Sequence, residues 1–263
     1  MELGIQGRTA LVLAASKGLG RASAVALARE GARIVIGART GKRLEQTARE
    51  IGAETGADVR CLPVDVTEPA QCQAVFDYAV AEFGSVDILV NNAGGPPFGP
   101  VEQFSDEDWH RALELNLMST VRLCRLVLPG MKAAGWGRII NILSLSVKSV
   151  LPGSVLSTAG RLGIAGMAKL LSDEVAAFGV TVNNVAPGTI LTDRVRQISL
   201  RQRMEQGMDE KTALEDISRA IPARRVGRPE ELGALVAFLA SEQASYITGS
   251  TIPVDGGIVR SIL

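Results

Sequence analysis

The sequence predicts an α/β protein with a doubly wound parallel sheet of about seven strands and helices on both faces of that sheet. Short apolar runs alternate with longer amphipathic segments from one end of the chain to the other. This alternation is typical of β–α–β units, whose crossovers are right-handed. Hydrophobic residues make up 46% of the 263 residues, which is enough for a large core. No linker, repeat or low-complexity tract divides the chain, so we expect one domain over residues 1–263.

The expected strands are short runs in which apolar residues follow one another with little interruption. A run of this kind indicates a strand that is buried on both faces. The seven runs cover residues 9–15, 33–38, 59–64, 86–90, 139–143, 180–185 and 250–254.

The expected helices lie between these runs and carry apolar residues at helical spacing. Gly31, Gly52 and Gly84 follow three of them, and glycine is the residue that most often ends a helix. An insertion over residues 192–228 precedes a helix that starts within 227–231, and we expect this insertion to form a helical flap. The helical segments cover residues 18–30, 42–51, 69–83 and 105–132.

Charge and composition argue against several classes of function. The 28 basic and 28 acidic side chains give a net charge of zero, whereas a nucleic-acid binder usually carries a basic excess. The three cysteines are far apart and His110 is the single histidine, so we expect neither disulfides nor a metal site. No apolar stretch reaches the ~20 residues that span a bilayer, and the N-terminus lacks the pattern of a signal peptide. We therefore expect a soluble, cytoplasmic protein.

The segment after the first expected strand is typical of a phosphate-binding turn. Residues 14–20 have the sequence AASKGLG and lead directly into a helix. Ligands of open parallel sheets bind beyond the carboxyl ends of the strands, and glycines there let a pyrophosphate approach the free N–H groups of a helix N-terminus. A short Gly-x-Gly turn also occurs where a helix simply needs a tight start. This motif alone therefore leaves both interpretations open.

The end of the second strand indicates which dinucleotide such a turn would bind. An NAD site usually carries an acidic residue here, whereas a basic residue suits the 2′-phosphate of NADP. The chain has Ala38 at the acidic position and Arg39 directly after it, and Lys17 could reach the same phosphate. We expect NADP(H) to be preferred, with NAD(H) as the alternative. Both bases could instead be solvated surface charges.

Five segments resemble the motifs of the short-chain dehydrogenase/reductase family, in the same order and at the same spacing. The stretches 227–231 and 244–257 resemble the branch of 3-oxoacyl-carrier-protein reductases most. The resemblance implies a single-domain Rossmann-type fold that binds NADP(H) and interconverts a carbonyl and an alcohol on a small molecule, such as a 3-oxoacyl thioester or a small ketone. The five segments are the glycine turn, Asp65-Val66, Asn91-Asn92-Ala93-Gly94, Pro187-Gly188 and Asp255-Gly256-Gly257.

The resemblance also implies a set of cofactor contacts. Asp65 and Val66 would contact the adenine, residues 92–94 the adenosine and nicotinamide side, and residues 187–192 the carboxamide end. Ala14 replaces the first glycine of the family's turn, and its methyl group should narrow the turn without abolishing pyrophosphate binding. The full set is Ala14, Ser16, Lys17, Gly18, Leu19, Gly20, Arg39, Asp65, Val66, Asn92, Ala93, Gly94, Arg161, Pro187, Gly188, Ile190 and Thr192.

At the catalytic positions the sequence departs from the family. Members generally use Asn, Ser, Tyr and Lys. The last two lie four residues apart on one helix face, where the ammonium lowers the pKa of the phenol so that it can transfer a proton. Asn116 and Ser144 match the first two positions, but Ser157 and Arg161 stand where Tyr and Lys belong. Positions 157 and 161 keep the spacing of four residues, but their side chains differ in chemistry from those of the family.

Neither of the two tyrosines can take the missing role. Tyr78 lies within the expected helix 69–83, and Tyr246 lies shortly before the last strand. We expect both to be packing residues.

Three interpretations of the altered centre remain open. In the first, a water held by Ser144, Ser157 and Arg161 passes the proton, and the guanidinium stabilises charge on the carbonyl oxygen. In the second, Lys148, on the loop after the fifth strand, donates the proton. In the third, the protein binds NADP(H) without turnover and acts as a sensor or a structural subunit. Retention of Asn116, Ser144 and the cofactor motifs favours an enzyme.

The flap carries an unusual number of charges, with bases leading and acids following. A solvated helical face explains this pattern, and so does contact between the leading arginines and an anionic substrate tail, such as phosphopantetheine or a CoA thioester. The resemblance implies in addition that the protein is a homo-oligomer, a tetramer or a dimer. The leading bases of the flap are Arg194, Arg196, Arg201, Arg203 and Lys211.

Overall fold

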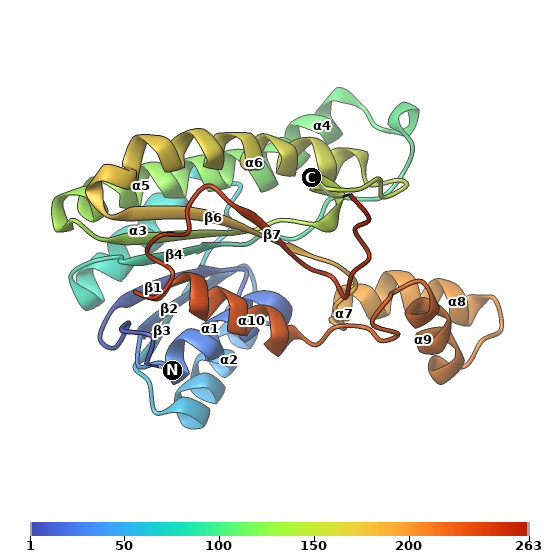
Figure 1. The fold of residues 1–263 in the computed structure, drawn as a ribbon, viewed down its shortest axis with the longest axis horizontal. Coiled ribbons are helices and arrows are strands. Elements are labelled where there is room, and N and C mark those ends of the chain that lie inside the picture. Colours follow the sequence, from blue (N-terminus) through green and yellow to red (C-terminus); the bar gives the residue numbers. More distant parts are fainter. Residues whose placement is uncertain (1, 262–263) are drawn as a thin grey trace.

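The computed structural model describes residues 2–261 and shows a seven-stranded sheet with a layer of helices on each face (Figure 1). The strand order is β3-β2-β1-β4-β5-β6-β7, and every neighbouring pair is parallel. The chain builds outward from β1 to β3 and then starts again at β4, on the other side of β1. The predicted doubly wound α/β fold in a single domain is confirmed.

The strands lie close to the predicted runs. β1 ends at Leu13 rather than at residue 15, because Ala14 takes a left-handed backbone conformation, with φ of 48°, that a strand cannot continue. The strands are β1 (Thr9–Leu13), β2 (Arg33–Ala38), β3 (Val59–Pro63), β4 (Ile88–Asn91), β5 (Gly137–Ile142), β6 (Val180–Pro187) and β7 (Thr251–Val254).

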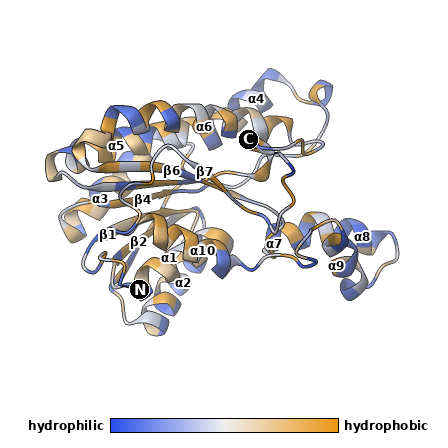
Figure 2. Ribbon diagram, in the orientation of Figure 1, coloured by the Kyte–Doolittle hydropathy of each residue, from blue (hydrophilic) through white to orange (hydrophobic). Residues whose placement is uncertain are grey.

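Helices cover both faces of the sheet and bury their apolar sides against it. On one face Val25, Leu44 and Leu232 join a hydrophobic cluster with the strands, and on the other face Leu123 and Ala168 do so. Figure 2 shows hydrophobic residues along the strands and more hydrophilic residues on the outer helices. The first layer consists of α1 (Gly18–Arg29), α2 (Gly41–Thr55) and α10 (Pro229–Leu239), and the second of α3 (Pro69–Phe83), α5 (Ser119–Ala134) and α6 (Val155–Val175).

The segment predicted as one helix over residues 105–132 is interrupted. Its first part, α4 (Asp106–Leu113), passes into a π-helical turn, Glu114–Met118, before α5 begins. The turn contains Asn116, whose Nδ2 donates a hydrogen bond to the carbonyl of Gly94 at 3.1 Å. Such a turn inserts one extra residue without changing the apolar character of the segment, so the sequence pattern did not reveal it. The remaining short turns are η1 (Val101–Gln103), η3 (Leu145–Val147) and η4 (Ala176–Phe178).

Residues 192–228 contain short helices that project beyond the carboxyl ends of β6 and β7 (Figure 1). This segment, called the flap below, has a small apolar cluster of its own that includes Leu200 and Ile217. Its elements are α7 (Asp193–Val195), the π-helical η5 (Arg196–Leu200), α8 (Arg201–Glu205) and α9 (Glu210–Arg219).

The two tyrosines have different surroundings. Tyr78, on α3, packs against the core as expected. The expectation for Tyr246 is wrong: its side chain is fully exposed on the loop between α10 and β7. Within residues 2–261, no helix has both the length and the apolar character needed to cross a bilayer.

Candidate active site

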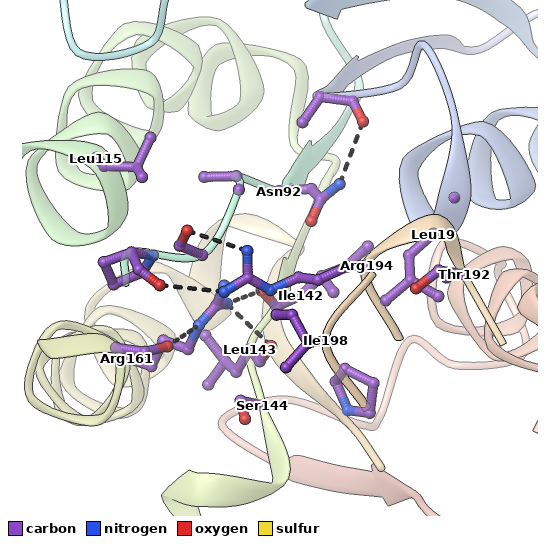
Figure 3. A pocket seen from close by; sticks show the side chains of 18 of the residues that line it. Leu19, Asn92, Leu115, Ile142, Leu143, Ser144, Arg161, Thr192, Arg194 and Ile198 are labelled. Atoms are coloured by element: carbon purple, nitrogen blue, oxygen red, sulfur yellow. Dashed lines mark hydrogen bonds between the residues drawn. The ribbon is translucent and has the colours of Figure 1, made fainter. Parts of the chain in front are cut away.

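A cavity of about 1000 Å³ opens at the carboxyl ends of the strands, between the sheet and the flap (Figure 3). It lies where β1 and β4 are neighbours, at the point where the order of the strands reverses. Open α/β sheets bind their ligands at this position, because the loops after the two strands separate there and leave a crevice.

The cavity brings together all but one of the residues expected to contact a cofactor. Gly20 is the exception, since it lies in the first turn of α1 and faces the backbone of Ala14 and Ala15 instead. A Cβ at Gly20 would lie 2.6 Å from the carbonyl oxygen of Ala14, so glycine is needed for the close packing of α1 against the turn. The lining residues from the expected set are Ala14, Ser16, Lys17, Gly18, Leu19, Arg39, Asp65, Val66, Asn92, Ala93, Gly94, Arg161, Pro187, Gly188, Ile190 and Thr192.

The glycine turn fits a pyrophosphate group. The N-terminus of α1 has no side-chain cap and no acidic residue in its first turn, so its free N–H groups can bind an anion. Gly18 has a φ of 60°, and Ala14 is held in the same left-handed region. Because this region strains any residue that carries a Cβ, Ala14 is a costly substitute for glycine.

The far end of the cavity offers Arg39 as a base, with Ala38 at the position where an NAD site usually carries an acid. Ala38 and Arg39 both line it, and Arg39 is exposed. Burial raises the pKa of Asp65, but two hydrogen bonds from Thr67 and the charge of Arg39 outweigh this effect and hold the pKa below its ordinary value. Lys17 forms an ion pair with Asp193 of the flap, with 2.9 Å between Nζ and Oδ2. Lys17 therefore connects the glycine turn to the flap.

Three of the four candidate catalytic residues line the cavity, namely Ser144, Ser157 and Arg161. Asn116 is buried behind the cavity wall, where it donates to the carbonyl of Gly94. Its Oδ1 is buried without a hydrogen-bond partner among residues 2–261. The position of Asn116 suits support of the segment 92–94 rather than contact with a ligand.

Arg161 is the most constrained charged group of the site. Its side chain rises from α6 toward the end of β5, and the residue is 8% exposed. Nη1 donates to the carbonyls of Ile142 at 2.7 Å and Leu143 at 2.9 Å, and Nε donates to Oγ of Ser157 at 3.1 Å. Burial lowers the pKa of Arg161 to about 10, and the charge of Arg194 contributes. The guanidinium thus stays protonated at neutral pH.

Ser144 and Ser157 line the cavity, and neither hydroxyl donates a hydrogen bond to the part of the chain that the structure describes. Ser157 Oγ accepts a hydrogen bond from Arg161, and Ser144 Oγ accepts one from the N–H of Ser146 at 3.2 Å. A hydroxyl whose oxygen already accepts can still donate its own proton. The two hydroxyls can therefore donate to an oxygen atom of a ligand and stabilise negative charge on it.

The sequence did not single out Arg194, the first base of the flap. It lies in the cavity wall, where Nη1 donates to the carbonyl of Gly95 at 3.2 Å and Nη2 to that of Pro96 at 3.1 Å. No local pattern distinguishes it from the other flap bases. Lys148, the alternative proton donor, is not among the residues that line the cavity.

The family model described as Enoyl-(Acyl carrier protein) reductase matches residues 13–259. The chain is 41% identical over 256 residues to the 3-oxoacyl-[acyl-carrier-protein] reductase FabG of Salmonella typhimurium, and the match covers 97% of this chain and 99% of that protein. It is 35% identical over 253 residues to D-threitol dehydrogenase of Mycolicibacterium smegmatis, with 96% and 93% covered.

Solved structures give the same result at the level of the fold. L-sorbose reductase from Gluconobacter frateurii, solved in complex with NADPH and L-sorbose, is 35% identical and matches with a TM-score of 0.96. This match covers 100% of both chains. Since both sequence and structure agree over the full length, the chain belongs to the short-chain dehydrogenase/reductase family.

Proposed function

We propose that the protein is an NADP(H)-dependent oxidoreductase that interconverts a carbonyl and an alcohol on a small molecule. The observation that carries this proposal is the hydrogen bond from Arg161 to Ser157, 3.1 Å long, inside the cavity that also contains the glycine turn. It supports the proposal because a protonated guanidinium and a hydroxyl group that can donate its proton both line the cavity in which we expect the cofactor. Support comes from the NADPH-bound L-sorbose reductase and from the 3-oxoacyl reductases among the relatives.

The cavity residues fit NADP(H) better than NAD(H). The glycine turn and the free N–H groups of α1 would hold the pyrophosphate. Arg39 would bind the 2′-phosphate, and Ala38 offers no carboxylate to repel that group. When bound, the cofactor supplies or accepts the hydride.

The proposed catalytic centre uses serine and arginine in place of the family's tyrosine and lysine. Ser144 and Ser157 would donate hydrogen bonds to the substrate oxygen, and Arg161 would stabilise negative charge there. A serine hydroxyl is a far weaker acid than a phenol, and Arg161 keeps its proton. The proton that accompanies the hydride would therefore pass through a water held by these three side chains. Asn116 would act as a positioning residue through Gly94.

A catalytically silent NADP(H)-binding protein is the second candidate. One observation favours it: neither Tyr78 nor Tyr246 lines the cavity, so no phenol is present to transfer the proton. In that case the protein would act as a sensor or a structural subunit. In either case we expect a homo-oligomer, a tetramer or a dimer, and a flap that covers the substrate.

The test combines a cofactor titration with a substrate panel. The dissociation constants of NADPH and NADH are measured on the purified protein, and NADPH oxidation is followed by absorbance with small ketones, sugars and 3-oxoacyl thioesters. Tighter NADPH binding together with turnover of one substrate class is the expected result. Tight NADPH binding without oxidation on any substrate would leave the silent protein as the function, and tighter NADH binding would overturn the cofactor assignment.

A further inference from the structure

Two arginines share the cavity without an acidic partner. Arg161 and Arg194 both line it, and Figure 3 shows their guanidinium groups at its centre. Their hydrogen bonds go to backbone carbonyls and to Ser157. Within residues 2–261 neither arginine forms an ion pair with a carboxylate. The cavity therefore holds two positive charges that the described protein does not neutralise.

The three arginines that follow Arg194 in the flap do not share this property. Arg196 pairs with Glu210, Arg201 with Glu205 and Arg203 with Asp216, in each case through a hydrogen-bonded ion pair. Acids of the flap therefore neutralise the charge of these three bases on a solvated surface. Arg194 differs because it turns away from the acids of the flap and toward the segment that follows Asn92.

Both guanidinium groups keep N–H donors free for a ligand. A guanidinium has five N–H donors, and Arg194 uses one on each terminal nitrogen for the carbonyls of Gly95 and Pro96. Nη2 of Arg161 makes no hydrogen bond to the described residues, although the residue is more than nine-tenths buried. A planar anion such as a carboxylate can accept two parallel hydrogen bonds from the N–H donors of a guanidinium group.

The burial of the two guanidinium groups, those of Arg161 and Arg194, favours an anion bound between them. Burial lowers the pKa of Arg194, and burial together with the charge of Arg194 lowers the pKa of Arg161. These directions mean that the charged forms are less stable in the cavity than in water. An anion bound there would remove this cost, because opposite charges attract more strongly where water is partly excluded.

We propose that Arg194, together with Arg161, binds a carboxylate carried by the substrate itself, so that the preferred substrates are oxo acids or the corresponding hydroxy acids. This inference rests on the proposed function and names the substrate class of the same site. Arg194 is then a specificity-determining residue on the flap. Arg161 contributes to the same subsite through its free Nη2.

The position of the two charges favours a carboxylate over the phosphate of an acyl carrier. Arg161 is hydrogen-bonded to Ser157, at the proposed reaction centre. An anion at Arg161 and Arg194 is thus only a short chain of atoms away from the carbonyl that reacts. The phosphate of a phosphopantetheine arm lies many bonds from its thioester and cannot reach both groups together.

Two variants remove the Arg194 contact in different ways. Arg194→Met deletes the charge and keeps much of the length of the side chain. Gly95→Ala keeps the charge but displaces it, because a Cβ at Gly95 would lie 2.5 Å from Nη2 of Arg194. Arg196→Met is the matched control, since Arg196 lies two positions along and pairs with Glu210 on the exposed surface.

The substrates are matched in the same way. A series of 2-oxo to 5-oxo carboxylates, which includes 4-oxopentanoate, is assayed, and each acid is compared with its methyl ester. The protein with NADPH should favour the acids. Arg194→Met and Gly95→Ala should lower kcat/KM for the acids by about 10- to 100-fold, the effect of losing a charge-assisted hydrogen bond. The same variants should leave the esters and the dissociation constant of NADPH unchanged, and Arg196→Met should change nothing.

Two results overturn the proposal. The first is equal kcat/KM for acids and esters in the unmodified protein. The second is a variant that weakens NADPH binding and slows both substrate series alike, because Arg194 would then serve the cofactor.

If no substrate is turned over, the proposed function fails, and calorimetry with 4-oxopentanoate on the NADPH complex still tests the subsite. Binding that Arg194→Met abolishes and Arg196→Met retains supports an anion subsite. Absence of binding to the unmodified protein contradicts it.

Discussion

Asn141 on β5 donates its side-chain amide to Oδ1 of Asn184 on β6 at 2.9 Å, as the middle link of a ladder across four strands. Asn91 on β4 donates to Oδ1 of Asn141 at 2.9 Å, and Asn184 donates to Oγ1 of Thr251 on β7 at 3.1 Å. The four residues are register partners in the sheet. Each side-chain amide therefore donates to the next residue of the ladder, although Oδ1 of Asn91 is buried without a partner among the described residues. The ladder lies in the half of the sheet that leads to Ser144.

Asn141→Ala should destabilise the protein by about 2–3 kcal/mol, because it leaves the buried Oδ1 of Asn184 without its donor and Nδ2 of Asn91 with only the sulfur of Cys124, a weak acceptor. Urea unfolding, followed by circular dichroism, measures the change. Asn92→Ala is the control, since the Asn92 amide makes one long hydrogen bond, 3.5 Å, at the cavity wall. Equal stability of the two variants would show that the ladder carries no free energy of folding.

Ala14→Gly should stabilise the protein by about 0.5–1 kcal/mol, because glycine adopts the left-handed φ of 48° without strain. The melting temperature measures this effect. Ala15→Gly, at the adjacent buried alanine, which does not have positive φ, should lower it instead. A lower melting temperature for Ala14→Gly would mean that the turn is not strained. Ala14→Gly should also bind NADPH at least as tightly as the unmodified protein does.

Glu231 should make the stability of the protein depend on pH in the acidic range. Its carboxylate accepts two hydrogen bonds from Arg225 and one from the N–H of Arg228, and these lower its pKa from 4.5 to about 2. Because the folded pKa is depressed, the stabilisation is complete above pH 4.5 and is lost as the pH falls toward 2.

Denaturant unfolding at a series of pH values tests this expectation. Glu231→Gln should be less stable at neutral pH and should lose less stability on acidification than the unmodified protein. Glu230→Gln changes the neighbouring exposed carboxylate and serves as the control. Parallel pH profiles for the unmodified protein and Glu231→Gln would refute the assignment.

The double change Ser157→Tyr with Arg161→Lys should raise kcat/KM for simple ketones by about 100-fold, because it restores a phenol beside an ammonium on one helix face. NADPH oxidation measures the gain. Ser157→Phe with Arg161→Lys adds the same ring without the hydroxyl and should show none. An equal rate in both variants would mean that the rest of the pocket has diverged from ketone reduction.

Local patterns were enough to predict the architecture and most of the residues that line the cavity. The strands are continuous apolar runs and the turn after β1 is rich in glycine, and both are features of neighbouring residues. Strand order and the meeting of β1 with β4 follow from the rules for parallel connections. The π-helical turn at Asn116 and the exposed Tyr246 were missed, because both depend on how segments far apart in the chain pack.

By itself the sequence determined the α/β class, the order of the motifs and the presence of serine and arginine at positions 157 and 161. Only the tertiary structure decided what the charges do. The five leading bases of the flap look equivalent along the chain, yet three of them find acids within the flap while Arg194 reaches the carbonyls of Gly95 and Pro96. The reason is physical: periodicity is a local property, whereas the partner of a charge depends on which distant segments the fold brings within a few ångströms of it.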